Sequence, residues 1–146
     1  LRFPFRWRYA LGAWKWLYFT PARFAADAGR TAAVNRGAYL AEALGHCGEC
    51  HTPRNLLGGT KRERHLAGGK DQAGKSVPNL TPTRLKKWSD AELNEYLMTG
   101  MTPEFDSADE TMAVVVRNTT SRLTAADRAA LIAYLRAVPP LPEESR

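Results

Sequence analysis

The run Cys47-Gly48-Glu49-Cys50-His51 decides how this chain of 146 residues is organised. Two thiols separated by two residues can each form a thioether with one of the two vinyl groups of a porphyrin, and the histidine that follows presents an imidazole to the iron. Cys47 and Cys50 are the only cysteines, so none is left for a disulfide framework or a four-thiolate metal site. The pattern predicts one covalently attached c-type haem, with His51 as an iron ligand.

Two other readings of the same run are weaker. A zinc site could use Cys47 and Cys50 with two of the three histidines, His46, His51 and His65, but zinc modules usually carry a second closely spaced ligand pair, which is missing here. A thioredoxin-like redox pair would follow a strand in an α/β pattern, which this sequence lacks. Neither alternative requires a histidine directly after the second cysteine.

Length and composition limit the chain to one core and a narrow set of partners. With 146 residues and 44% hydrophobic content, we expect a single domain plus an extension. The net charge of +6 suits an acidic protein, an anionic membrane surface or nucleic acid, and we expect it to steer an acidic redox partner. No window reaches the ~18 continuous apolar residues of a membrane-spanning helix.

The first 24 residues hold nine of the fourteen aromatic side chains, interleaved with basic residues. On a helix, one face would carry Trp7, Leu11, Trp14 and Tyr18. We expect this face to pack on the haem domain, or on a neighbouring haem domain or subunit, with peripheral association with a membrane as the alternative. Aromatic and basic interleaving can also suit single-stranded nucleic acid, but nothing else in the chain supports that partner, so we expect none.

The remaining pattern predicts an all-α fold. A connector over Pro21–Thr31 precedes a helix that ends near Gly45 and has one stripe of small and apolar residues; a loop over Thr52–Lys87 then wraps the haem. Ser89 and Glu92 form a capping box for a helix that stops at Gly100, and Thr124 with Asp127 begins a last helix that ends at Pro139. The stripe consists of Ala33, Gly37, Leu40 and Leu44, and the buried face of the last helix of Ala130, Leu131, Tyr134, Leu135 and Val138.

These elements divide the chain into an aromatic-rich extension and connector over residues 1–31, a haem domain over residues 32–142 and a tail over residues 143–146. The one strand candidate, Val114–Val116, is too short to change the class. The domain order therefore places every predicted haem contact after residue 32.

The second iron ligand is expected to be a methionine, because methionine opposite histidine gives a six-coordinate electron carrier of raised potential. Met112 is the strongest candidate, since it lies in the predicted loop between the last two helices. Met101 follows a helix stop directly, and Met98 lies inside a helix where core filling is its usual role. Met101, Met98, His65 and an open site, at which the protein supplies no second ligand, remain alternatives to Met112. An open site would favour a small haem redox enzyme of peroxidase-like type.

With haem motif, loop, capped helix, methionine and final helix in this order, the chain resembles the monohaem cytochrome c domain superfamily. More specifically, it is similar to one haem domain of the multihaem cytochrome c subunits that serve bacterial membrane-bound alcohol, gluconate and sorbitol dehydrogenases. The most specific matches are Asn35-Arg36-Gly37-Ala38-Tyr39-Leu40, Gly45-His46 through Arg54-Asn55, Pro78-Asn79-Leu80-Thr81-Pro82 and Val115-Val116-Arg117-Asn118-Thr119-Thr120.

The resemblance implies thioethers at Cys47 and Cys50 and iron ligation by His51 and Met112. It further implies that the carbonyl of Pro78, which with Asn79 belongs to the haem surroundings, accepts a hydrogen bond from the His51 ring. Trp88 and Arg54 are implied partners of the haem propionates. The chain departs from the family pattern in its short basic segment over residues 83–87 and in having Ala113 rather than glycine after the methionine.

We therefore expect an all-α monohaem cytochrome c fold that transfers electrons and is not itself an enzyme. Its partners would be a dehydrogenase subunit as donor and an oxidase or another cytochrome as acceptor in a respiratory chain. Thioether attachment of haem takes place outside the cytoplasm, so the expected location is periplasmic. The chain starts at Leu1 and shows no export signal, so we expect a processed or truncated product.

Overall fold

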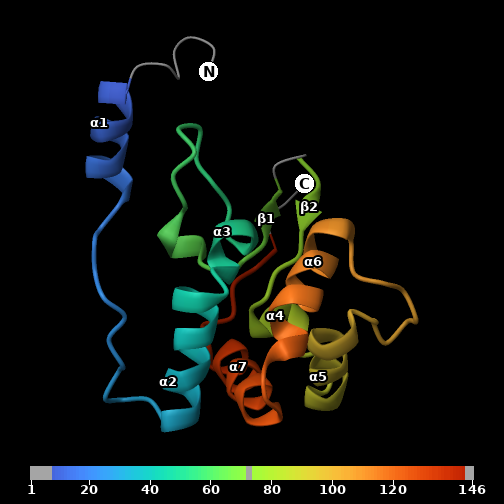
Figure 1. The fold of residues 1–146 in the computed structure, drawn as a ribbon. Coiled ribbons are helices and arrows are strands. Elements are labelled where there is room, and N and C mark those ends of the chain that lie inside the picture. Colours follow the sequence, from blue (N-terminus) through green and yellow to red (C-terminus); the bar gives the residue numbers. More distant parts are fainter. Residues whose placement is uncertain (1–7, 72–73, 144–146) are drawn as a thin grey trace.

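Helices build most of the chain in the computed structural model, which describes residues 8–71 and 74–143 (Figure 1). The predicted all-α class is confirmed for these residues, because the sheet among them is a single antiparallel pair of two-residue strands. The elements in chain order are α1 (Arg8–Tyr18), α2 (Ala32–Ala38), the π-helix η1 (Tyr39–Leu44), α3 (Cys47–His51), the 3₁₀ turn η2 (Arg62–Arg64), β1 (Gly69–Lys70), β2 (Ser76–Val77), α4 (Pro82–Leu85), α5 (Asp90–Thr99), α6 (Glu110–Asn118), the 3₁₀ turn η3 (Thr120–Arg122) and α7 (Ala125–Ala137).

The helix before the haem motif begins at α2 and continues without a break into η1. Thr31 caps α2 by accepting a hydrogen bond from the amide of Val34, and Gly45 follows η1 at the predicted end. The buried stripe is shorter than predicted at both ends, because Gly37 and Leu40 are buried, whereas Ala33 is exposed and Leu44 is 55% exposed. A π-helix has about one residue more in each turn than an α-helix, so the side chains of η1 leave the stripe that an α-helix would continue.

The packing of α2 against α7 forms the centre of the core. A Cβ atom added at Gly37 would lie 2.0 Å from the carbonyl oxygen of Ala130 and 2.7 Å from Cβ of Tyr134, so the two helices meet with no room for a side chain. Thr124 caps α7 as predicted, and all five residues of its predicted apolar face are buried. An exposed pair between Arg36 and Asp127, with 2.7 Å between nitrogen and oxygen, extends the contact to the surface.

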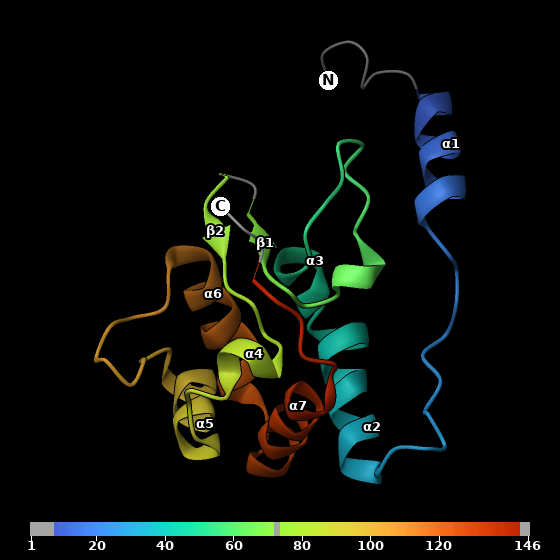
Figure 2. The same ribbon diagram turned by 180° about the vertical axis from the view of Figure 1, so that it is seen from behind.

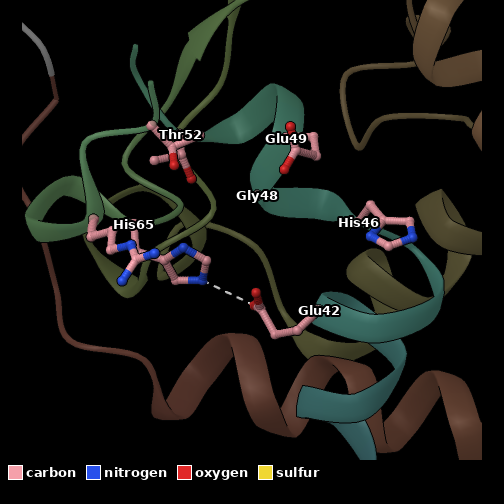
Figure 3. A pocket seen from close by; sticks show the side chains of 8 residues that line it. Glu42, His46, Gly48, Glu49, Thr52 and His65 are labelled. Atoms are coloured by element: carbon pink, nitrogen blue, oxygen red, sulfur yellow. Dashed lines mark hydrogen bonds and ion pairs between the residues drawn. The ribbon is translucent and has the colours of Figure 1, made fainter. Parts of the chain in front are cut away.

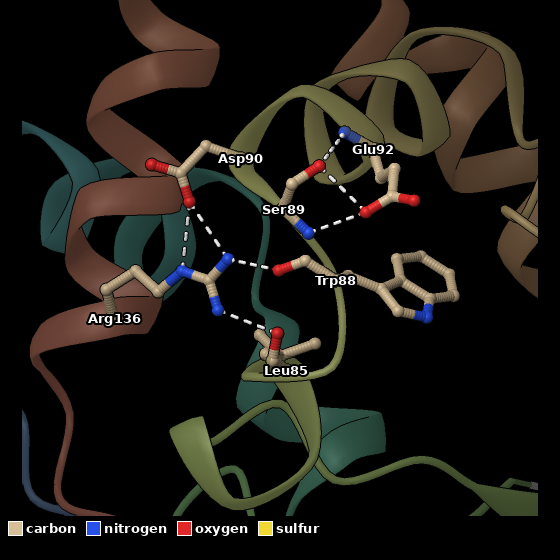
Figure 4. Close-up of polar contacts among 6 residues, drawn as sticks. All are labelled: Leu85, Trp88, Ser89, Asp90, Glu92 and Arg136. Atoms are coloured by element: carbon tan, nitrogen blue, oxygen red, sulfur yellow. Dashed lines mark hydrogen bonds and ion pairs between the residues drawn. The ribbon is translucent and has the colours of Figure 1, made fainter.

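The helix α5 packs on the other side of α7, and Arg136 of α7 holds the chain that leads into it (Figure 4). The guanidinium donates to the carbonyl oxygens of Leu85 and Trp88 at 2.7 and 2.5 Å and pairs with Asp90. Ser89 caps α5 in the predicted capping box. Gly100 ends α5 with φ +81°, a left-handed conformation that favours glycine.

The segment over residues 52–87 contains more structure than the predicted loop. It holds η2, the β1–β2 pair with Gly69 opposite Val77, and the short helix α4. These elements are too short to produce a hydrophobic period, so sequence patterns do not detect them. Leu66, which lies between η2 and β1, is fully buried and packs into the main core.

Two predictions about the segment before α7 are wrong. Met112 lies in the helix α6 and not in a loop, and Val114–Val116 belongs to the same helix and not to a strand. Asp109 caps α6 through its side chain, and Val116 is buried while Val114 is exposed, which is a helical pattern of burial. Tertiary packing has overridden the β preference of three successive valines.

The aromatic segment forms α1, which stands beside the domain and is joined to α2 by an extended connector (Figures 1 and 2). Two residues of the predicted face contact the loop after the haem motif. Trp14 Nε1 donates to the carbonyl of Leu57 at 2.8 Å, and the ring of Tyr18 covers Gly59. Leu11 is exposed, and Trp7 lies outside the described residues. None of the helices described is both long and apolar enough to span a membrane.

The close approach of α2 and α7 yields a test of the fold. Gly37→Ala should lower the free energy of unfolding by about 2–3 kcal/mol, because the added methyl group forces the two helix backbones apart. The measurement is chemical unfolding followed by circular dichroism. Gly12→Ala is the matched control: the same change on α1 meets nothing within 4 Å and should leave the stability unchanged or slightly raised. Equal stability of the two variants would contradict the packing.

Candidate haem-attachment site

The short helix α3 contains the whole Cys47–His51 run. It starts directly after His46, whose backbone is left-handed with φ +49°, and ends at Thr52, which returns to extended backbone. This turn places Cys47 partly buried, Cys50 exposed and His51 buried. The two thiols are free, as thioether formation requires.

His51 is held in one orientation and one protonation state. Its Nδ1 lies 2.7 Å from the carbonyl oxygen of Pro78, and because a carbonyl can only accept, Nδ1 carries the proton. Burial lowers the pKa of His51, against the opposing effect of the Pro78 bond, so the ring is neutral at neutral pH. Nε2 then keeps a free lone pair, which is what a metal ion needs.

The segment that carries Pro78 is itself fixed by buried hydrogen bonds. Asn79 is 2% exposed; its side-chain amide donates to the carbonyl of Leu141 at 2.9 Å, and its side-chain oxygen accepts from the amide of Thr81 at 2.7 Å. Asn79 therefore ties the segment that carries Pro78 to the chain beyond α7. This contact gives a structural reason for the asparagine after the proline, a reason that the sequence alone does not provide.

The strand β1 contacts α3 and pairs with β2, which leads into Pro78. A Cβ atom added at Gly69 would be 2.6 Å from the carbonyl oxygen of Cys50, so this backbone can approach only as glycine. The amide of Gly68 donates to the carbonyl of His51 at 2.9 Å. These contacts leave α3 little freedom to rotate.

The environment of Cys47 keeps it a neutral thiol. Burial, and secondarily the negative charge of Glu42, raise the pKa of Cys47 to about 11. Among the described residues no group of three or more histidine, cysteine, aspartate or glutamate side chains could hold a metal ion. The donor set thus suits thioether attachment of a haem with a single histidine nitrogen toward the iron.

The other predicted site residues lie in different surroundings. Met112 is partly buried in the first turns of α6, and α6 and α3 occupy the same half of the domain in both views (Figures 1 and 2). Met101 is 44% exposed, and Met98 is 39% exposed, with its sulfur 3.9 Å from Arg128 Nη2. Core filling therefore does not describe Met98. The assignment of Met112 as second ligand stays a prediction.

Arg54 and Trp88 are both engaged by the protein. Arg54 pairs with Glu49 at 2.5 Å and donates to the carbonyl of Gly58 at 2.8 Å, so it closes the loop that follows α3. Trp88 is partly buried and packs edge to face on Tyr96, with 5.4 Å between ring centroids. Their roles toward propionates stay predictions.

One contact near the site has no signal in the sequence. His65 Nε2 donates to Glu42 Oε1 at 2.9 Å (Figure 3). Tyr134 Oη donates to the same oxygen at 2.7 Å. The three residues come from the loop before β1, from η1 and from α7. From the sequence, His65 is recognisable only as a possible metal ligand. His65 lies 23 positions and Tyr134 lies 92 positions from Glu42, and no local sequence pattern predicts contacts over such separations.

A largely helical domain that carries two thiols and one imidazole on a single turn, with the histidine oriented by a carbonyl, is typical of proteins that attach haem covalently. The cytochrome c family model matches residues 34–139, and the chain belongs to this family. Membership implies a covalent c-type haem with iron and haem-based electron transfer. The single two-cysteine motif is consistent with one attachment site in this chain.

Similar proteins carry the same implication. The chain is 49% identical over 140 residues to a dihaem c-type cytochrome of Cereibacter sphaeroides, an alignment that covers 95% of this chain and 46% of that protein. It is 38% identical to the fructose dehydrogenase cytochrome subunit of Gluconobacter japonicus, with 95% and 29% covered. It is 30% identical to the cytochrome c subunit of the quinone alcohol dehydrogenase of Gluconobacter oxydans, with 98% and 32% covered.

The chain thus spans about half or less of the curated relatives it matches. Two of these relatives are named as cytochrome subunits of dehydrogenases, which confirms the predicted resemblance and agrees with an electron-transfer role rather than a catalytic one. Their alignments also include most of the segment ahead of α2, so nothing marks that segment as an addition peculiar to this chain.

Proposed function

We propose that this chain transfers electrons through one haem c ligated by His51 and Met112, between a dehydrogenase and a respiratory acceptor. The observation that carries the proposal is the buried, neutral His51 with its Nδ1 proton on the Pro78 carbonyl, next to two free cysteines. When bound, the haem supplies an iron that gains and loses one electron. The named relatives from Gluconobacter support the class of partner.

The residues of the chain would set how this electron is held. The Pro78 carbonyl orients the His51 ring and makes it a more basic ligand, which favours the oxidised iron. The Met112 side chain, as a second ligand, would act in the opposite direction and raise the potential. Cys47 and Cys50 would keep the cofactor attached regardless of its redox state. The chain would thus offer the iron one more basic ligand, His51, and one weaker ligand, Met112.

The distal assignment is tested with the holoprotein. A haem spectrum that survives acid and organic extraction is expected, because the thioethers at Cys47 and Cys50 are covalent. Met112→Ala should remove the methionine-to-iron charge-transfer band, whereas Met101→Ala, the control on an exposed methionine, should keep it. Absence of covalent haem would end the proposal, and rapid carbon monoxide binding by the unmodified protein would favour an open-site haem enzyme.

We also propose a periplasmic location, since thioether attachment of haem occurs outside the cytoplasm. Fractionation of cells that express the natural gene should place the haem-stained protein in the periplasmic or membrane fraction. A haem-stained product confined to the cytoplasmic fraction would contradict this location.

The aromatic segment is proposed to bind a second haem domain. The face of α1 turned toward the domain is used by Trp14 and Tyr18, while Tyr9 and Trp16 on the other side are 94% and 84% exposed. The segment over residues 1–24 has five basic residues and no acidic one, which suits an acidic protein partner. The matched dihaem cytochrome has more than half its length outside the alignment, which supports a haem domain as occupant.

Site-specific photocrosslinking tests this docking face. A photoreactive residue in place of Trp16 should crosslink to a haem-staining polypeptide, or to another haem domain of the same natural protein, in cells that express it. The same residue in place of Trp14, whose ring nitrogen is bonded to Leu57, should crosslink mainly within the chain. Crosslinks from position 16 to lipid alone would overturn the proposal in favour of a membrane surface.

A further inference from the structure

His65 lies directly behind the haem-attachment turn. It lines a surface cavity of about 260 Å³ together with Glu42, His46 and Gly48 (Figure 3). A Cβ atom added at Gly48 would be 3.0 Å from Cε1 of His65, so the imidazole packs closely against the backbone between the two cysteines. Nothing in the proposed electron transfer uses this histidine.

A carboxylate anchors the ring from the opposite side. Glu42 Oε1 accepts both from His65 Nε2, at 2.9 Å, and from Tyr134 Oη, at 2.7 Å. Burial alone would raise the pKa of Glu42, but the hydrogen bonds from His65 and Tyr134 lower it below its ordinary value. Glu42 is therefore ionised at neutral pH, and a charged acceptor makes both bonds stronger than neutral ones. The anchor joins His65 to η1 and to α7.

The chain after His65 runs along the side of the site that carries His51 and Pro78, which we call the proximal side. The amide of Leu66 donates to Thr52 Oγ1 at 3.1 Å, the amide of Gly68 donates to the carbonyl of His51 at 2.9 Å, and the carbonyl of Leu66 accepts from the amide of Leu80 at 2.8 Å. Residues 65–68 therefore contact both α3 and the segment that carries Pro78. We call these residues the proximal strap.

The strap contains a strained residue at its centre. Leu66 has φ +59°, a left-handed conformation that is unfavourable for a leucine, and it is fully buried. Such a conformation persists only where the surroundings determine it. The core holds the side chain of Leu66, and the bond from His65 to Glu42 holds the backbone just before it.

We propose that His65 is a positioning residue for the haem: its bond to Glu42 holds the proximal strap, which keeps the His51 ring on the Pro78 carbonyl. This inference rests on the proposed function, since it concerns the ligand that His51 would supply. Loss of the anchor would let the strap relax, so that the distance between Nδ1 of His51 and the Pro78 oxygen grows. The imidazole then becomes a less basic ligand, and the reduced iron is favoured.

The experiment uses the holoprotein with His65→Leu, which removes the donor, and His65→Gln, which keeps one. At a fixed ambient potential, the ratio of reduced to oxidised protein should rise measurably in the leucine variant, because a less basic imidazole favours the reduced iron. In the glutamine variant this ratio should be close to that of the unmodified protein. Exchange of the His51 Nδ1 proton, followed by NMR, should be faster in the leucine variant only.

His46→Asn is the matched control. His46 lines the same cavity, but its side chain is exposed. Its backbone is left-handed, a conformation that asparagine tolerates. This substitution should alter neither the potential nor the exchange of the His51 proton. If His65→Leu fails to fold, Tyr134→Phe, which removes one of the two donors to Glu42, should give a smaller change of the same sign. Unchanged potential and exchange in the folded variants would overturn the inference.

The haem spectrum distinguishes a failure of the proposed function from a failure of the positioning role. Unmodified protein without covalent haem, or without the methionine-to-iron band, would contradict the proposed function. Unmodified protein with both features, and with a potential that no change at His65 or Tyr134 moves, would contradict only the positioning role.

Discussion

The hydrogen bond from His51 Nδ1 to the Pro78 carbonyl is the constraint around which the rest of the molecule is arranged. A buried imidazole can present a lone pair to a metal only if its other nitrogen is protonated and held by an acceptor. The acceptor here is a backbone carbonyl, which cannot titrate and cannot rotate away. Its position then depends on how firmly the chain over residues 78–81 is held, and Asn79 holds it to Leu141 near the end of the domain.

The two halves of the domain achieve rigidity by different means. The half built from α2, α5 and α7 relies on direct packing, and Gly37 allows helix axes to approach as closely as backbones permit. The half around α3 is made of short elements joined by single hydrogen bonds, with glycine at the closest contact to Cys50. Glu42 connects the halves, because it accepts hydrogen bonds from Tyr134 of α7 and from His65 in the loop before β1.

Local signals predicted the parts of the fold that depend on neighbours in sequence. The capping box at Ser89, the glycine stop at Gly100 and the cap at Thr124 each involve residues within four positions, and all three are present. The attachment motif is local in the same sense. The assignment of Met112 to a loop failed because the segment between the two predicted helices was taken as loop, whereas the cap at Asp109 and burial of Val116 favour a helix there.

Contacts between distant residues could not be predicted in the same way. The bonds that converge on Glu42 join three elements, and the π-helical turn that carries Glu42 has no periodic signature. The strap residues look like loop in sequence because their hydrogen bonds go to α3 and to Leu80 rather than to each other. Only the resemblance to cytochrome c domains pointed to the Pro78 carbonyl, and it gave no reason for the asparagine after it.

The division between a packed half and a hydrogen-bonded half suits a protein that transfers electrons. The geometry around an iron must change little when its charge changes, and loops alone would relax to follow the charge. Fastening α3 to a helical core through Glu42, and to the C-terminal segment through Asn79, limits that relaxation without placing a charged side chain against the imidazole itself. Because the groups that bond His51 directly are backbone atoms, ionisable residues such as Glu42 and His65 can act on the site only through position and distant charge.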